Sequence, residues 1–368
     1  MTPAGMAMPH NASIDTIRPY QPGKPIEEVE RELGLHSVIK LASNENPLGP
    51  SPEAVRAAGR ALAKAALYPD SAAYPLTRKL AEKHGIPPDS VIIGTGSDQL
   101  FMLLALVLLN PQTNAVISEF TFPTYAISAH SVGAELRVAQ AGPGLGHEVD
   151  HLLAAVDSTT RIVFVDNPNN PIGSYLTRSA ITRLLEAVPR DTLVVLDEAY
   201  YEFVDAPDYV SGLEYLSRYP NLMVTRTFSK AYGLAGFRIG YGMADPALVR
   251  LLQRVRLPFS VSHLALAAAE AALDDEAHLA QTRRLVLKER PELAGLLEQH
   301  RIRTLPSQGN FVTGLAPIPS RSLFEELLKT GIIIRPLTAM GLPDHVRVTV
   351  GLPDQNQALA KALEAVLG

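Results

Sequence analysis

Between residues 52 and 258, short apolar runs alternate with longer stretches of helical pattern. Five of these runs lack the regular polar positions of a half-exposed strand. They are VIIG from Val91, NAVIS from Asn114, RIVFVDN from Arg161, TLVVLDEAY from Thr192 and NLMVTRTFS from Asn221. Strands that are apolar on both sides and separated by helices are typical of a mainly parallel sheet covered on both faces. The pattern therefore predicts an α/β fold for this region.

The remainder of the chain has a mixed pattern. A long helical stretch runs from Pro258 to about Gln299, and shorter segments of strand and helix follow it, among them a helix expected at 320–329. Near the N-terminus, a short helix expected at 26–33 ends at Gly34, a residue type that commonly closes helices. Mixed strands and helices at this spacing predict a smaller α+β domain, completed by the N-terminal segment.

We therefore expect three segments. Residues 1–50 would form an N-terminal arm and part of the small domain, 51–258 the large domain, and 259–368 the small C-terminal domain. In parallel sheets, ligands bind beyond the carboxyl ends of the strands, and domain junctions are also common ligand sites. The sequence thus predicts a ligand site where the strand ends of the large domain meet the small domain.

Composition narrows the range of functions. Apolar residues make up 46% of the chain and charged residues 19%, the net charge is -5, and no run of Lys and Arg resembles a nucleic-acid-binding patch. The absence of cysteine excludes disulfides, thiolate nucleophiles and Cys-ligated metals. The longest apolar run, Leu100 to Leu109, is far shorter than the roughly 20 residues of a membrane-spanning helix. With no signal-peptide pattern, we expect a cytoplasmic protein that binds small molecules, and neither nucleic acid nor membranes.

The most informative segment for chemistry is RTFSKAYGLAGFRIG, residues 226–240. A predicted strand ends in Thr227 and Ser229, Lys230 follows directly, and two turns lead to Arg238. A lysine beside hydroxyl groups and an arginine suits a covalent bond to an aldehyde next to a bound phosphate. Taken alone, the segment is more typical of a surface loop with an exposed lysine.

Three other predicted strand ends favour the covalent interpretation. Asp197 ends an apolar strand, where a carboxylate needs a partner such as a protonated ring nitrogen, and Tyr200 follows one turn later. Asn170 follows a third strand and can donate a hydrogen bond to a phenolate oxygen. The glycine turn at 94–96 precedes Ser97 and Asp98 at a helix start, which suits a phosphate.

One further motif suggests zinc. Residues 147–151, HEVDH, have the spacing of the two histidines and the glutamate of zinc proteases. The segment follows the turn-forming run AGPGLG, and Asp150 resembles the N-cap of a helix that would begin at Leu152. A solvated helix start explains the pattern better, and we expect no metal site.

Together, these strand ends occur in the order of a known family. The chain resembles the fold type I pyridoxal-phosphate-dependent aminotransferases, and among them the histidinol-phosphate aminotransferase branch, over nearly its whole length. The segments that carry the resemblance are RPYQPGKPIEEVERELGL, KLASNENPLGPSP, LYPD, GTGSDQ, FPTY, NPNNPIG, LDEAY, RTFSKAYGLAGFRIGYG, GNF, GIIIRPL and RVTVG. The resemblance implies a large domain with helices on both faces of a mainly parallel sheet, a smaller α+β domain, pyridoxal 5'-phosphate as cofactor, and a homodimer.

The resemblance also implies roles for single residues at the cofactor. Lys230 would bond the cofactor aldehyde and move a proton between the substrate Cα and the cofactor C4′. Asp197 would pair with the ring nitrogen, Tyr200 and Asn170 would bond the ring oxygen, and Tyr125 would stack on the ring. The cofactor phosphate would be held by Ser97, Asp98, Thr227, Ser229, Arg238 and, from a neighbouring subunit, Tyr68.

For the substrate, the resemblance implies that Arg347 pairs with the carboxylate of glutamate, a task that suits the planar guanidinium. Asn170 would also contact the substrate, and Arg335 and Tyr20 match positions near its distal end, where histidinol phosphate carries its phosphate. The implied reaction transfers an amino group between L-histidinol phosphate and 2-oxoglutarate, giving imidazole-acetol phosphate and glutamate, in histidine biosynthesis.

Three other functions remain open at this point. An aromatic amino-acid aminotransferase of the same branch would use the same site, because a pocket for imidazole also admits a phenyl ring. A decarboxylase acting on threonine phosphate would share the cofactor but would form no pyridoxamine phosphate with glutamate. A cofactor-binding regulator without activity is disfavoured by the intact lysine segment.

Overall fold

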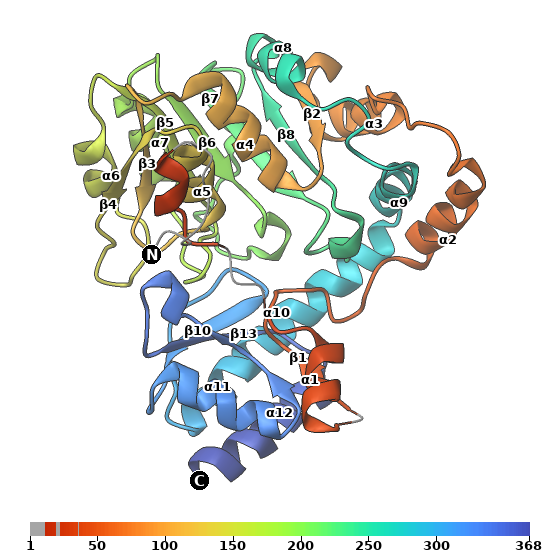
Figure 1. The fold of residues 1–368 in the computed structure, drawn as a ribbon, viewed down its shortest axis with the longest axis vertical. Helices are drawn as coiled ribbons and strands as arrows, with labels where there is room; N and C mark the ends of the chain where they lie inside the picture. The colour runs from red at the N-terminus through yellow and green to blue at the C-terminus, as the bar shows by residue number, and fades with distance from the viewer. Residues whose placement is uncertain (1–11, 20–22, 36) are drawn as a thin grey trace.

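The computed structural model describes residues 12–19, 23–35 and 37–368. In this part of the chain, the large region is built on a seven-stranded sheet in the order β2-β8-β7-β6-β5-β3-β4 (Figure 1). Its strands are β2 (Val91–Gly94), β3 (Asn114–Ser118), β4 (Glu135–Ala139), β5 (Thr160–Asp166), β6 (Leu193–Asp197), β7 (Leu222–Thr227) and β8 (Gly240–Ala244). β8 runs antiparallel to β2 and β7, and the other neighbours are parallel. The predicted α/β class with a mainly parallel sheet is confirmed.

The sequence pattern does not predict β4 and β8, and each omission has a physical reason. Glu135 and Arg137 give the edge strand β4 a polar, partly exposed character. In β8, Gly240 and Gly242 weaken the strand signal, because glycine offers no side chain to pack. A Cβ at Gly242 would lie 2.2 Å from the Met223 side chain, so close packing between β8 and β7 favours glycine there.

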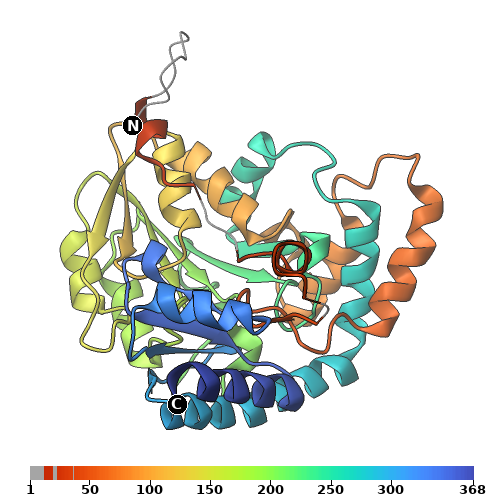
Figure 2. The same cartoon turned by 60° about the horizontal axis from the view of Figure 1, so that its bottom comes forward.

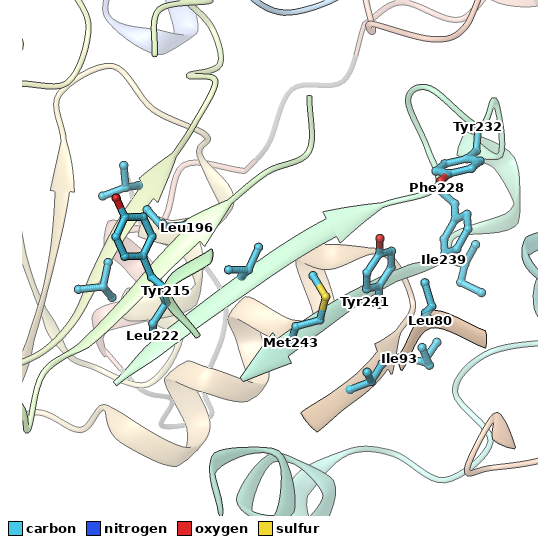
Figure 3. Close-up of a cluster of buried hydrophobic side chains, with 14 of the residues drawn as sticks. Leu80, Ile93, Leu196, Tyr215, Leu222, Phe228, Tyr232, Ile239, Tyr241 and Met243 are labelled. Atoms are coloured by element: carbon cyan, nitrogen blue, oxygen red, sulfur yellow. The ribbon is translucent and has the colours of Figure 1, made fainter. Parts of the chain in front are cut away.

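Helices cover both faces of this sheet because each carries one apolar stripe. They are α2 (Pro52–Ala61), α3 (Tyr74–His84), α4 (Ser97–Leu108), α5 (Thr124–Ser131), α6 (Val149–Ala155), α7 (Arg178–Ala187), α8 (Pro246–Val255) and α9 (His263–Asp274). α4, α5 and α8 share one buried cluster with the sheet, and α2, α3, α6, α7 and α9 share another. Figure 3 shows part of the second cluster, with Leu80 of α3 near Ile93 of β2 and Tyr241 of β8.

A smaller region lies against the carboxyl ends of the large sheet (Figures 1 and 2). Its antiparallel sheet, four-stranded in the described part of the chain, has the order β12-β13-β10-β9. The strands are β9 (Arg303–Thr304), β10 (Phe311–Leu315), β12 (Arg335–Pro336) and β13 (His345–Thr349). The helices are α11 (Ser320–Lys329), α12 (Pro353–Leu367) and the long α10 (Glu276–Gln299), whose leucines share a buried cluster with the sheet.

The N-terminal segment belongs to this smaller region. α1 (Ile26–Leu33) ends at Gly34, which adopts the left-handed conformation expected of a helix-closing glycine. β1 (Ile39–Lys40) pairs in parallel with β11 (Ile332–Ile333). The chain then passes to α2 of the large region through residues 41–51.

The long helical stretch after Pro258 is two helices, because Asp275 separates α9 from α10. Its carboxylate accepts hydrogen bonds from the His278 backbone N–H, at 3.0 Å, and from Ser51 Oγ, at 2.6 Å. α9 packs on α2 within the buried cluster of the large sheet. The expected domain boundary after residue 258 stays a prediction. Among the helices of residues 12–19, 23–35 and 37–368, none is both long and apolar enough to cross a membrane.

Candidate active site

A cavity of about 440 Å³ lies where the carboxyl ends of β5, β6 and β7 face the smaller region. This is the place that the strand pattern predicts for a ligand. Its wall brings together most of the predicted site residues, namely Ser97, Asp98, Asn170, Asp197, Tyr200, Thr227, Ser229, Lys230, Arg238 and Arg347. Of the predicted residues within the described part of the chain, Tyr125, Tyr68 and Arg335 are not part of this wall.

Lys230 lies three residues beyond the end of β7, and its side chain reaches into the cavity. Its ammonium group donates a hydrogen bond to the carbonyl oxygen of Ser43, at 3.0 Å. Burial, and next to it the positive charge of Arg347, lower the pKa of Lys230 to about 8. A larger fraction of this amine is therefore neutral near pH 7 than for an ordinary lysine, and a neutral amine is a nucleophile and a base.

Asp197 ends β6 on the floor of the cavity and is only 4% exposed. Tyr125 Oη donates to Oδ2 at 2.7 Å and Thr225 Oγ1 to Oδ1 at 3.0 Å. Burial is the main cause that raises the pKa of Asp197 to about 7, and the nearby Asp166 raises it further. A cation bound above the carboxylate would oppose both effects, so the site suits a positively charged ring nitrogen.

At the opposite wall, a hydrogen bond joins Asn170 to Arg347, and Tyr200 is bonded to Asn44. Arg347 Nη1 donates to Asn170 Oδ1, and Nη2 donates to the Ala42 carbonyl at 2.9 Å. Because its oxygen accepts from Arg347, Asn170 presents its amide nitrogen as a donor elsewhere. Tyr200 Oη accepts from Asn44 Nδ2 at 2.9 Å.

An anion-binding corner is formed by the N-terminus of α4 and the segment after β7. Gly96 precedes α4 with a positive φ of 75°, and a Cβ there would lie 2.8 Å from Arg238 Nη2. Arg238 has a φ of 54°, which is uncommon for a non-glycine residue, and its guanidinium lies 3.2 Å from Asp98 and 3.5 Å from Ser229 Oγ. Helix N-termini and arginine both attract phosphate groups, so this corner suits one.

The prediction that Tyr125 stacks on a ligand ring is wrong in this structure. Tyr125 lies in the first turn of α5 with its side chain turned toward the sheet, fully buried, and its ring stacks on Phe164 with centroids 4.8 Å apart. Its hydroxyl supports Asp197 from below. Phe122, three residues earlier in the same FPTY segment and just before α5, lines the cavity instead.

The other predicted residues lie outside the cavity wall. Tyr68 is 79% exposed and stacks on Phe259, with ring centroids 4.7 Å apart. Arg335 is buried at the start of β12 and lines two neighbouring cavities of about 510 and 350 Å³. Its pairing partner in the antiparallel sheet is Arg347, so both side chains leave the same face. Tyr20 lies outside the described residues.

The structure agrees with only part of the prediction for the zinc-like motif. α6 begins at Val149 with Glu148 as N-cap, so Asp150 lies inside the first turn and pairs with Arg183. The interpretation as a solvated helix start is wrong for His147, whose side chain is 1% exposed and contacts Asp166. His151 lies on the exposed side, 2.9 Å from the Gln140 carbonyl. Within the described part of the chain, no group of three or more His, Cys, Asp or Glu side chains could hold a metal.

Several residues in the wall were not predicted, namely Ser43, Asn44, Glu45, Phe122, Thr124 and Asp166. The first three follow β1 and reach the cavity only because the N-terminal segment crosses between the two regions. Asn44 also has a positive φ, of 55°, and it is held there because its backbone N–H donates to Thr349 Oγ1 and its side-chain amide donates to Tyr200 Oη. Such long-range placement leaves no local signal in the sequence.

Comparison with known proteins agrees with this geometry. The model of the family "Aminotransferase class I and II" matches residues 36–364. A histidinol-phosphate aminotransferase of Anaeromyxobacter sp. is 48% identical, with 98% of each chain covered, and histidinol-phosphate aminotransferase 2 of Pseudomonas aeruginosa is 45% identical, with 96% of each covered. The crystal structure of histidinol-phosphate aminotransferase from Sinorhizobium meliloti in complex with pyridoxal-5'-phosphate matches with a TM-score of 0.89, at 29% identity and 97% coverage of each chain.

Proposed function

Because the chain belongs to the family of class I and II aminotransferases, we propose that it transfers an amino group between L-histidinol phosphate and 2-oxoglutarate. The products are imidazole-acetol phosphate and glutamate, in a step of histidine biosynthesis that we place in the cytoplasm. The enzyme is a pyridoxal-phosphate-dependent aminotransferase. The observation that carries the choice of substrate is the pairing of Arg335 with Arg347, which supplies two neighbouring cations for anionic substrate groups.

The described residues fit pyridoxal phosphate at both ends of the cavity. At one end, the α4 N-terminus, Ser229 and Arg238 suit the phosphate, and glycine keeps the backbone open for it. A Cβ at Gly240 would lie 2.6 Å from the Ser97 nitrogen, which would disturb the helix start. At the other end, the buried Asp197 suits a protonated ring nitrogen, as its raised pKa indicates that it needs a cation.

When bound, pyridoxal phosphate supplies an aldehyde that carries the amino group and a ring that withdraws electrons from the substrate Cα. Lys230 is placed to hold the aldehyde and then, as a free amine, to take the proton from Cα and return it. Its lowered pKa keeps a neutral amine available for this step. Asn170 would donate to the ring oxygen, and Tyr200, whose hydroxyl is oriented by Asn44, would bind the same oxygen.

The two arginines account for the two substrates. Arg347 faces the cavity and is fixed by Asn170 and by the Ala42 carbonyl, so its guanidinium is oriented for a carboxylate. Arg335 lies on the same face of the hairpin but in the neighbouring cavities, where a phosphate on the far end of a substrate would reach it. An aromatic amino acid offers no group for this second cation.

The substrate assignment predicts a selective effect of Arg335→Ala. We expect kcat/KM for histidinol phosphate to fall about 100-fold, because a hydrogen bond to a charged group contributes about 1.5–3 kcal/mol. The kcat/KM for phenylalanine should change less than about threefold, because phenylalanine carries no phosphate that could contact Arg335. Steady-state kinetics with both donors measure the difference.

Two results would argue against this assignment. Equal losses for histidinol phosphate and phenylalanine would remove the reason for preferring the phosphate-bearing substrate. Higher wild-type turnover with phenylalanine would favour an aromatic amino-acid aminotransferase. Arg218→Ala, which removes an exposed arginine of the large region that pairs with Glu186, is the control and should leave both rates unchanged.

We also propose that the enzyme is a homodimer that forms through an exposed apolar surface. Two segments carry exposed apolar side chains, with Leu62, Leu67 and Tyr68 after α2 and Leu257 and Phe259 after α8, and the stacking of Tyr68 on Phe259 brings the two segments together. Contiguous exposed apolar side chains mark interaction sites. A second copy seated there would bring Tyr68 toward the cofactor phosphate of its neighbour, the role that the family resemblance implies.

The dimer proposal predicts that Leu67→Asp combined with Leu257→Asp produces a monomer with strongly reduced turnover. Charges that are buried without partners destabilise an interface. Without the interface, Tyr68 of the neighbouring subunit would no longer reach the cofactor phosphate. Light scattering measures the molar mass. Val138→Asp, at an exposed apolar residue of the edge strand β4, is the control and should keep the wild-type mass. A monomeric wild-type enzyme with full activity would contradict the proposal.

A further inference from the structure

The first histidine of the HEVDH segment has contacts that the cofactor and substrate roles do not explain. His147 lies in the loop before α6, and its imidazole is almost completely buried, with 1% of the side chain exposed. Its Nε2 lies 2.9 Å from the carbonyl oxygen of Asp166 and 2.9 Å from Oδ1 of the same residue. Both atoms only accept hydrogen bonds, whereas the contact of Nε2 with Asn169 Nδ2, a donor, is longer at 3.3 Å, so we assign the ring hydrogen to Nε2, which donates it to Asp166.

Asp166 in turn connects to the cavity wall. It ends β5, is 2% exposed, and is the pairing partner of Asp197 on β6. Oδ1 also accepts hydrogen bonds from Thr121 Oγ1 and from Asn169 Nδ2, the latter at 3.2 Å. Oδ2 accepts from the backbone N–H of Asn170 at 2.8 Å. A buried carboxylate next to a second one is costly unless donors surround it, and His147 is one of those donors.

The connection continues to the smaller region. Asn170 Oδ1 accepts a hydrogen bond from Arg347 Nη1. Three contacts therefore join His147 to Arg347 through Asp166 and Asn170, and they run from the loop before α6, under the cavity, to β13 of the other sheet. His147 is one of the donors that fix the Asp166 carboxylate, and Oδ2 of this carboxylate holds the Asn170 backbone at the place from which the Asn170 side chain meets the guanidinium.

We infer that His147 is a positioning residue, which acts through Asp166 and Asn170 to orient Arg347 for the carboxylate of glutamate and 2-oxoglutarate. This inference rests on the proposed function, because it takes Arg347 as the carboxylate-binding residue. It assigns a use to the histidine of the zinc-like motif without a metal. Its partner in the motif, His151, contacts Gln140 on the exposed side and has no place in the connection.

The test replaces the ring by one of similar size without a donor, in His147→Phe. We expect KM for glutamate and 2-oxoglutarate to rise about tenfold, the effect of one hydrogen bond to a charged group, and kcat to change less than about threefold. The dissociation constant of succinate, a dicarboxylate that cannot react, should rise by the same factor when measured by calorimetry on the holoenzyme.

Variants at the same position separate positioning from packing. His147→Gln places an amide donor near the position of Nε2, and we expect it to restore KM and the succinate constant to within about threefold of wild type. His147→Asn places its donor near Nδ1 and should behave like the Phe variant. His151→Gln is the matched control and should resemble wild type. If His147→Phe does not fold, the comparison of Asn with Gln replaces it.

A double variant shows whether the effect passes through Arg347. If it does, His147→Phe should weaken succinate binding little further in the Arg347→Lys background, because the oriented guanidinium is already absent. Additive losses would overturn the inference, and so would an unchanged succinate constant in His147→Phe. Failure of the proposed function itself would appear differently, as wild-type enzyme that does not transaminate histidinol phosphate.

Discussion

Lys230→Ala should abolish the absorbance of the covalently held cofactor and lower transamination by about 10,000-fold or more, the contribution that one positioned acid–base group reaches by itself. The lysine is the only amine among the residues that line the cavity within the described part of the chain, so no neighbour replaces it. Absorbance spectra of the purified holoenzyme and single-turnover rates with glutamate measure the two effects.

The control for this experiment is Lys329→Ala, which removes an exposed lysine on α11 that pairs with Glu326. It should keep wild-type spectra and rates. Cofactor that remains bound without covalent attachment is consistent with the proposal, since the phosphate corner is unchanged in Lys230→Ala. Normal turnover in a variant that has lost the absorbance would exclude Lys230 as the proton-transferring residue.

Asp197→Asn should lower kcat roughly 1,000-fold, because breaking a buried charge pair costs about 3–5 kcal/mol. The amide has the size of the carboxylate and keeps a partner for Tyr125 and Thr225, but it cannot hold a proton on the cofactor ring nitrogen. Asp197→Glu keeps the charge and should recover part of the activity. Pre-steady-state kinetics with glutamate, which follow the chemical step alone, give the measurement.

Asp191→Asn makes the same change at an exposed carboxylate and should leave the chemical step unaltered. The role of Asp197 would be disproved by an Asn variant that reacts as fast as wild type. A loss confined to cofactor affinity, with normal rates at saturation, would show that the residue only binds the ring and does not keep it charged.

Local patterns in the sequence were sufficient to predict the buried strands whose ends form the site. The strands that end at Asp166, Asp197 and Thr227 are buried on both faces, and Lys230 lies three residues after the last of them, so the meeting of these residues at one edge follows from parallel pairing. The end of α1 at Gly34 and the helix at 320–329 could also be predicted, since each signal lies within the element itself.

The remaining features depend on contacts between distant segments. Phe122 and Tyr125 belong to one short motif, and only the direction in which α5 enters decides which of them faces the cavity. The sequence predicted a solvated His147 because its neighbours are polar. The burial of its side chain follows from the position of Asp166, nineteen residues away. Ser43, Asn44 and Glu45 reach the site only through the crossing of the N-terminal segment.

The hairpin of β12 and β13 carries a thermodynamic consequence. Arg335 and Arg347 are direct cross-strand partners, and like charges in that arrangement repel each other and weaken a sheet. A ligand anion that lies between them relieves this repulsion, so the native state gains more from binding than the new contacts alone would give. A neutral residue in place of either arginine would remove this repulsion and would also harm recognition, so this hairpin couples the stability of the small sheet to the ligand that the enzyme binds.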